Sequence, residues 1–129
     1  MILTNANNST EDYLKKILIL HARNGCVRAV DLAAELGVTK PSVSAAMKKL
    51  RGKKLIYINE NGHICLTGEG RVIAEAVNSK HELIKDFLMK IGVSEVTASG
   101  DACRIEHAIG EETFERLGEF CSKNKELLK

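Results

Sequence analysis

Apolar residues recur at the three- and four-residue spacing of helices in six stretches of the chain, and two short stretches after the third are rich in β-forming residues. Glycines stand where several of these stretches end, at Gly25, Gly37, Gly92 and Gly110. The pattern predicts helices over residues 10–23, 29–36, 40–53, 68–91, 94–109 and 111–123. We therefore expect a mainly α fold.

Hydroxyl side chains mark where several of these helices begin. Ser9 or Thr10 can cap the first helix, Thr39 the third and Thr67 the fourth, because a hydroxyl oxygen can accept from a backbone N–H of the first turn. Pro41 falls in the first turn of the third helix, where its missing N–H costs no hydrogen bond. These signals place the three helix starts near residues 10, 40 and 68.

The second and third predicted helices are separated by a short turn that contains Gly37, which is typical of a helix-turn-helix unit. Residues 55–59 and 63–66 flank Asn61-Gly62, a strong hairpin signal. A hairpin directly after a helix-turn-helix unit is typical of a winged helix. We expect residues 1–70 to form a winged helix-turn-helix DNA-binding domain and residues 71–129 to form an α-helical domain.

Charge is distributed unevenly along the chain. The formal net charge of the whole chain is only +2, yet residues 40–54 contain six basic residues and no acidic one. This asymmetry indicates a surface that binds DNA phosphates. The alternative is an ordinary solvated helix of a winged-helix protein that binds another protein; the order of the elements favours DNA. The side chains that we expect to contact DNA are Thr39, Lys40, Pro41, Ser42, Ser44, Lys48 and Lys49.

The four cysteines are widely spaced and form no CxxC pair, so neither a zinc ribbon nor a thioredoxin-like motif is indicated. The first ten residues are polar and rich in Asn, unlike a secretory signal. No apolar run approaches the roughly 20 residues that a membrane span needs. We therefore expect a reduced, cytoplasmic protein that does not enter the membrane.

The fifth predicted helix contains three potential metal ligands: Cys103, then Glu106 three residues later and His107 four residues later. At about 100° per residue, these spacings place all three side chains on one helix face. Sulfur and nitrogen ligands with one carboxylate suit Fe, Co, Ni or Zn better than Mg or Ca. The alternative is a surface acid, a histidine near a helix end and a buried cysteine that packs as a small apolar residue.

Several segments resemble the diphtheria toxin repressor and manganese transport regulator family of metal-dependent repressors. In family order, the matching segments are Thr10-Glu11-Asp12-Tyr13-Leu14, Pro41-Ser42-Val43-Ser44, Leu66-Thr67-Gly68-Glu69-Gly70, Lys80-His81-Glu82-Leu83 and Asp101-Ala102-Cys103-Arg104-Ile105-Glu106-His107. The resemblance implies a winged-helix domain, a helical metal-binding and dimerisation domain, and a homodimer that binds a palindromic double-stranded DNA operator. Relatives in the iron branch carry a further SH3-like domain, which we expect to be absent because the chain ends at Lys129.

The resemblance also implies a metal site made of Asp12, Cys103, Glu106 and His107. His81 would be either an auxiliary ligand or a partner that orients Glu106. The site would be a hybrid, since Asp at position 12 matches the manganese branch and Cys at position 103 matches the iron branch. We expect Fe(II) to be favoured and Mn(II) next, with Zn(II), Co(II) and Ni(II) left open.

The positions that would hold a second ion carry other residues. Lys15 stands where the manganese branch has a carboxylate, Lys85 stands where the iron branch has one, and Ser99 replaces a histidine. Because a protonated lysine cannot bind a metal, we expect one ion per chain, with Lys15 offsetting excess negative charge of the ligands. The alternative is that both lysines are exposed and paired at most with neighbouring acids.

Together these expectations predict a transcriptional repressor of metal-ion homeostasis genes with a divalent metal as corepressor. We expect no enzymatic activity, because the sequence offers no separate catalytic pair. The alternative function is a metal-independent winged-helix regulator, or a protein-interaction module, with a vestigial metal site.

Overall fold

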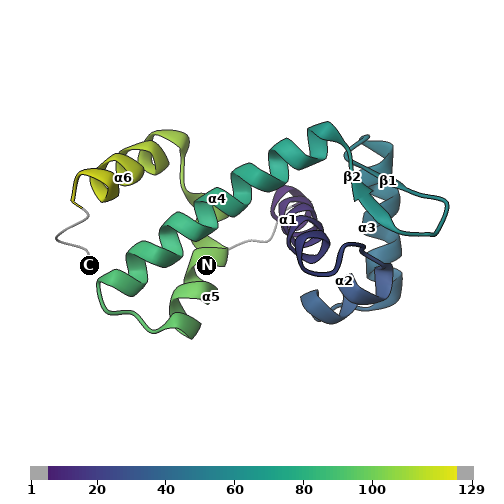
Figure 1. Ribbon diagram of the computed structural model, residues 1–129, viewed down its shortest axis with the longest axis horizontal. Coiled ribbons are helices and arrows are strands. Elements are labelled where there is room, and N and C mark those ends of the chain that lie inside the picture. Colours follow the sequence, from purple (N-terminus) through teal and green to yellow (C-terminus); the bar gives the residue numbers. More distant parts are fainter. Residues whose placement is uncertain (1–5, 125–129) are drawn as a thin grey trace. The chain divides into compact units, whose positions relative to one another are not determined.

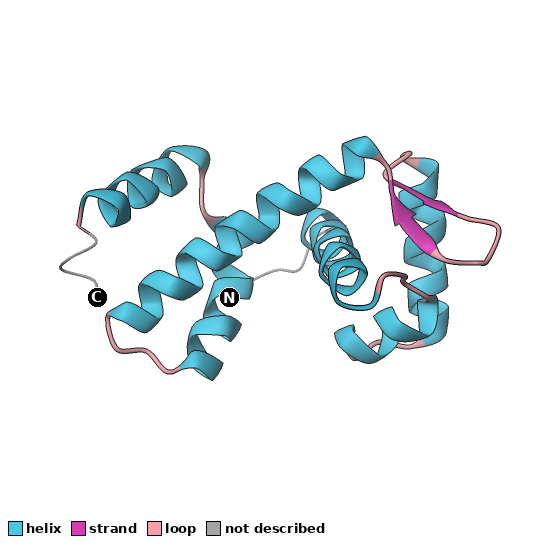
Figure 2. Cartoon of the chain, in the orientation of Figure 1, coloured by secondary structure: helices cyan, strands magenta, loops and turns pink. Residues whose placement is uncertain are grey.

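The computed structural model describes residues 6–124, in which six helices and one antiparallel pair of strands follow one another along the chain (Figure 1). Helices account for most of the described residues, as Figure 2 shows, so the predicted mainly α fold is confirmed. None of these helices is both long and apolar enough to cross a membrane. The elements are α1 (Ala6–Asn24), α2 (Ala29–Leu36), α3 (Lys40–Gly52), β1 (Ile56–Ile58), β2 (Ile64–Leu66), α4 (Gly68–Lys90), α5 (Glu95–Ala108) and α6 (Glu111–Lys123).

The chain divides within α4 into two compact units, Met1–Ala76 and Val77–Lys129. The first unit contains the helix-turn-helix and the hairpin, and the second contains α5, α6 and the C-terminal part of α4. The domain boundary that we expect after residue 70 stays a prediction.

Helix α1 begins at Ala6, so the predicted start near Ser9 or Thr10 was wrong. A hydroxyl residue can cap a helix but does not prevent it from starting earlier, and Ala at position 6 has the highest intrinsic helix propensity. The apolar face of α1 contributes Tyr13, Leu14 and Ile17 to the core of the first unit. Burial raises the pKa of Tyr13 above its usual range, because a buried phenolate would lose its hydration.

The helix-turn-helix forms as the pattern predicts. Gly37 ends α2 with a φ of 65°, a conformation that favours glycine, and Thr39 caps α3 by accepting a hydrogen bond from the backbone N–H of Ser42 at 3.3 Å. The buried faces of the two helices meet in one apolar core, to which they contribute Leu32, Val43, Met47 and Leu50. The opposite face of α3 is left exposed.

The hairpin β1–β2 packs beside α3 as the wing (Figure 1). It is tied to the connection between α1 and α2 by a hydrogen bond from the backbone N–H of Ile64 to the carbonyl of Val27 at 2.7 Å. The side-chain oxygen of Asn59 accepts from the backbone N–H groups of Asn61 and His63, at 3.0 and 2.9 Å. The tip of the wing is therefore held by its own hydrogen bonds.

Helix α4 starts in a tight connection to the end of α3. The hydroxyl of Thr67 accepts from the backbone N–H of Gly70 at 3.1 Å and donates to the carbonyl of Lys54 at 2.8 Å. A Cβ atom at position 70 would lie only 2.0 Å from the carbonyl oxygen of Leu55. Only glycine allows this approach between α4 and the residue before the wing.

The second unit is built from apolar and polar contacts between α4 and the two helices that follow it. Ser94 caps α5, since its hydroxyl accepts from the backbone N–H of Thr97 at 3.4 Å. Lys80 on α4 holds the start of α6, with its ammonium 2.8 Å from a carboxylate oxygen of Glu111 and 5.8 Å from the ring centre of Phe114. These contacts fix the starts of α6 and α5, and α5 carries the candidate metal ligands.

Candidate metal centre and nucleic-acid interface

Four of the predicted metal-site residues lie together in the second unit. His81 lies on α4, and Cys103, Glu106 and His107 lie on α5. The Nδ1 atom of His81 is 2.8 Å from Oε1 of Glu106 and 3.8 Å from the sulfur of Cys103. The Nε2 atom of His107 is 3.6 Å from the other carboxylate oxygen of Glu106. One carboxylate is thus flanked by two imidazoles, with a thiol beside one of them.

The carboxylate of Glu106 is fully buried, since its side chain has 0% exposed surface. A buried carboxylate is costly unless opposite charge or hydrogen-bond donors compensate it. His81 can donate a hydrogen bond to it from Nδ1, or a bound cation can take the place of the Nδ1 proton. A cation is therefore one of the partners that suit this buried carboxylate.

The donor atoms match what a divalent transition metal needs. Ligand atoms of His81, Cys103 and Glu106 all lie within 4.8 Å of one another. Ligands around a tetrahedral ion at about 2.0–2.3 Å are separated from each other by roughly 3.3–3.8 Å, so small side-chain shifts would bring these three to coordination distance. The residues present thus fit a metal of borderline softness, such as Fe(II) or Zn(II).

The alternative interpretation of these residues does not match their environment. It requires a surface-exposed Glu106 and a buried Cys103, whereas the carboxylate is buried and Cys103 is exposed. An exposed thiol beside a buried carboxylate and an imidazole is accessible to an ion from solvent.

Two other predicted residues, Asp12 and Lys15, lie on α1 in the first unit. The role of Asp12 as a ligand stays a prediction. Lys15 is only 3% exposed, so the alternative in which it is an exposed lysine is wrong. Lys85 is half-buried, and it agrees with the alternative only in its ion pair, with its ammonium 3.7 Å from a carboxylate oxygen of Glu95.

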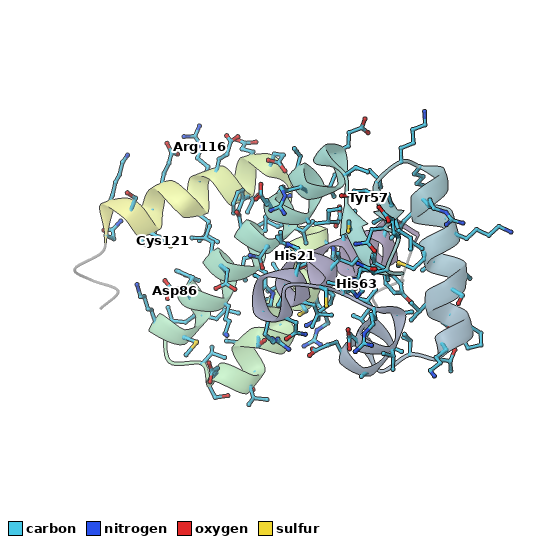
Figure 3. The ribbon with its side chains drawn as sticks, turned by 45° about the vertical axis from the view of Figure 1, so that its right-hand side comes forward. His21, Tyr57, His63, Asp86, Arg116 and Cys121 are labelled. Atoms are coloured by element: carbon cyan, nitrogen blue, oxygen red, sulfur yellow. The ribbon has the colours of Figure 1, made fainter. Side chains whose placement is uncertain are left out.

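The remaining histidines and cysteines belong to no group of three potential ligands among residues 6–124. Figure 3 shows His21 on α1, His63 at the hairpin and Cys121 on α6, each from a different element. Cys26 and Cys65 are half-buried thiols. This placement agrees with their interpretation as core or surface residues.

The predicted DNA-contacting residues form one exposed surface. All seven, from the cap of α3 to its third turn, are exposed to solvent: Thr39, Lys40, Pro41, Ser42, Ser44, Lys48 and Lys49. Arg51, one of the six basic residues of the predicted DNA-binding stretch, lines the space between α3 and the wing together with Ile58. Sequence reasoning did not single out Ile58, because nothing local in the sequence indicated it.

Two family models match the chain in sequence. One, described as the iron dependent repressor N-terminal DNA binding domain, matches residues 6–64, and the other, the iron dependent repressor metal binding and dimerisation domain, matches residues 67–126. Transcriptional regulator MntR of Escherichia coli is 35% identical over 88% of this chain and 74% of its own length. The chain belongs to the iron-dependent repressor family. The resemblance to metal-dependent repressors of this family is thereby confirmed.

Two other proteins that are similar to this chain agree with this placement. An uncharacterised helix-turn-helix-type transcriptional regulator of Methanocaldococcus jannaschii is 37% identical over 93% of this chain and 98% of its own length. The structure of the manganese regulator SloR superposes with a TM-score of 0.79 at 31% identity, over 88% of this chain and 53% of that one. The chain thus spans about half the length of this solved relative. The predicted combination of a winged helix with a helical domain is confirmed by the family models.

Proposed function

We propose that this protein represses genes of metal-ion homeostasis, with a divalent metal as corepressor and Fe(II) favoured over Mn(II). The observation that carries the proposal is the cluster in which Glu106 is buried between His81 and His107 and lies beside Cys103. A family model described as a metal binding and dimerisation domain covers all four residues. The matches divide between iron and manganese, since the family models are described by iron and SloR by manganese.

In this proposal the metal ligands are Cys103, Glu106, His107 and Asp12, with His81 as a further ligand or an orienting partner. Asp12 belongs to the DNA-binding unit and the others to the second unit. A bound divalent ion would add positive charge beside these anionic side chains. With these side chains shared by one site, the two units would be held in one relative orientation.

That orientation would matter because we expect the protein to bind a palindromic operator as a homodimer. Two recognition helices must fit half-sites about one helical turn apart, roughly 34 Å on B-DNA. Metal-dependent ordering of each chain would select the geometry in which both helices fit. The equilibrium can shift only by as much as the metal binds the DNA-competent state more tightly.

The metal centre is tested by titrating the protein anaerobically with Fe(II), Mn(II) and Zn(II) and measuring the affinity of each by calorimetry. We expect Glu106→Gln to weaken binding by roughly tenfold or more, because it removes the buried charge while preserving side-chain size. Glu82→Gln is the matched control, since Glu82 is exposed next to His81 on the same helix. Equal affinities of the two variants would rule out the proposed centre.

A further inference from the structure

Two of the four cysteines flank the hydrogen bond that ties the wing to the connection between α1 and α2. The backbone N–H of Ile64 donates to the carbonyl of Val27 at 2.7 Å. Cys65 follows Ile64 and Cys26 precedes Val27, and both thiols are unbridged and half-buried. The two cysteines are therefore far apart in sequence but lie next to the same backbone contact, entirely within the first unit.

The two segments run in opposite directions past this hydrogen bond. His21, in the last turn of α1, lines a cavity together with Cys65 and Leu66, so the end of β2 lies beside α1. The connection begins at Gly25, directly after α1, and leads away to α2. Partners in antiparallel backbone advance along one segment while they retreat along the other. The residue opposite Cys65 is therefore the one before Val27, which is Cys26.

Burial agrees with this arrangement. Val27 and Ile64 are 0% and 3% exposed, so both side chains point into the core. Successive side chains of extended backbone point to opposite faces, which places Cys65 on the outer face of the wing, paired with Tyr57 of β1. Cys26 shares that face when it stands across from Cys65. Residues that flank a hydrogen-bonded pair in this way have Cα atoms about 4.5 Å apart, which is within the range of disulfides.

A cavity of about 140 Å³ lies between α1, the wing and the start of α4, and it makes the thiol of Cys65 accessible to a small molecule. The imidazole of His21 lines the same cavity. An imidazole can accept a thiol proton, and the thiolate is the form of cysteine that reacts with peroxides. Hydrogen peroxide fits the space, since a water molecule takes only about 30 Å³ of the liquid.

We propose that Cys65 and Cys26 are a peroxide-reactive pair, in which Cys65 reacts first and Cys26 then closes a disulfide between the wing and the connection. The Cys65 thiolate attacks one oxygen of hydrogen peroxide, the O–O bond breaks, and the departing hydroxide takes a proton to become water. The Cys26 thiolate attacks the sulfur of the resulting sulfenic acid, the S–O bond breaks, and a second water forms. Two thiols and one hydrogen peroxide thus give one disulfide and two waters.

The disulfide would close a loop that contains α2, α3 and β1. Closing a long loop restricts mainly the unfolded chain, so the oxidised protein should be the more stable form. A disulfide that forms only on exposure to peroxide suits a protein whose thiols are otherwise reduced. Neither cysteine is among the proposed metal ligands, so the pair is independent of the proposed function.

The experiment treats the full-length protein, without added metal, with a small excess of hydrogen peroxide. The remaining thiols are then alkylated, and digestion and mass spectrometry identify the linked peptides. We expect one intramolecular disulfide, between Cys26 and Cys65. We also expect a melting temperature about 5 °C or more above that of the reduced protein, and a dithiol should reverse this rise.

Cys26→Ser separates the two steps, because it leaves the Cys65 sulfenic acid without a thiol to attack it. We expect dimedone to capture that sulfenic acid and the melting temperature to stay unchanged on oxidation. Cys121→Ser is the matched control, since Cys121 lies on α6 in the second unit. It should form the Cys26–Cys65 disulfide as readily as the wild-type protein.

Peroxide-treated wild-type protein in which Cys26 and Cys65 stay unlinked would overturn the proposal. A disulfide that forms equally fast in protein unfolded by urea would also overturn it, because the fold would then not bring the two thiols together. Neither result bears on the metal centre.

Discussion

At the scale of single residues, we expect Cys103 to set the metal preference of the proposed centre. Its sulfur lies 3.8 Å from the imidazole of His81, where it adds a soft donor to an otherwise nitrogen and oxygen set. We expect Cys103→Asp to raise the preference for Mn(II) over Zn(II) by roughly tenfold or more, because carboxylate oxygen is harder than thiolate. Competition with a chromophoric chelator measures this ratio.

Cys121→Asp is the control for that substitution, since Cys121 lies on α6 and belongs to no ligand group among the described residues. We expect its metal preference to equal that of the wild-type protein. An unchanged ratio in Cys103→Asp would show that the thiol is not a ligand.

Lys15 bears on how many ions each chain holds. It is 3% exposed, and an ammonium buried to this degree requires compensating negative charge. We expect the wild-type protein to bind one ion per chain, because the Lys15 ammonium supplies the positive charge that a second ion would supply. We expect Lys15→Glu to bind two ions, because a carboxylate would replace that ammonium. Metal analysis of anaerobically dialysed protein gives the count.

Lys16→Glu is the matched control, because Lys16 is adjacent to Lys15 on α1. Its ammonium lies 3.9 Å from a carboxylate oxygen of Glu35, which belongs to no group of potential metal ligands among the described residues. This variant should bind one ion. Two tightly bound ions in the wild-type protein would contradict the role given to Lys15.

At the scale of elements, the start of α4 depends on Gly70. A Cβ atom there would lie 2.0 Å from the carbonyl oxygen of Leu55, and backbone on both sides leaves little room to adjust. We expect Gly70→Ala to lower the free energy of unfolding by about 3 kcal/mol, the upper end of typical overpacking effects. Urea denaturation followed by circular dichroism measures the change.

Gly68→Ala tests the same helix without the close contact, since nothing lies within 4 Å of a Cβ atom at position 68. We expect it to be neutral or to stabilise by about 0.5 kcal/mol through the unfolded chain. If both variants were equally stable, the close approach at Gly70 would not be a constraint on the fold.

Local sequence signals predicted the helices and strands better than they predicted contacts between residues far apart in the chain. Helices α2 and α6 have the predicted bounds, and Thr39 caps α3, because capping and periodicity act within a few residues. The contact between Gly70 and Leu55 joins residues separated by a strand pair, and no nearby residue signals it. The predicted start of α1 was too late, because hydroxyl residues that could cap a helix stand near residue 10, whereas the helix begins before them at Ala6.

The same distinction applies to the candidate metal centre. The spacing of Cys103, Glu106 and His107 in the sequence was enough to predict that they lie on one helix face. The contact of His81 with Glu106 joins α4 to α5 across 25 residues, and only the fold brings it to 2.8 Å. Complete burial of the Glu106 carboxylate was likewise not predictable from the sequence, which left a surface acid as an alternative.

At the scale of the whole molecule, the proposal is a coupling between two units of one chain. The DNA-reading surface lies in the first unit and the buried Glu106 in the second. Neither unit alone accounts for metal-dependent repression: the first carries the basic surface, and the second carries most of the proposed ligands. Asp12 is the predicted link, because it is a proposed ligand supplied by the DNA-binding unit.

The central claim is tested most directly by anaerobic fluorescence anisotropy on upstream DNA of a metal-uptake operon, with and without Fe(II) or Mn(II). We predict that metal increases the affinity of the wild-type protein for this DNA by at least about tenfold, within the usual range of allosteric coupling. Asp12→Ala should lose this increase and retain weak, salt-sensitive binding. Equal affinity with and without metal in the wild-type protein, or a full metal response in Asp12→Ala, would contradict the account.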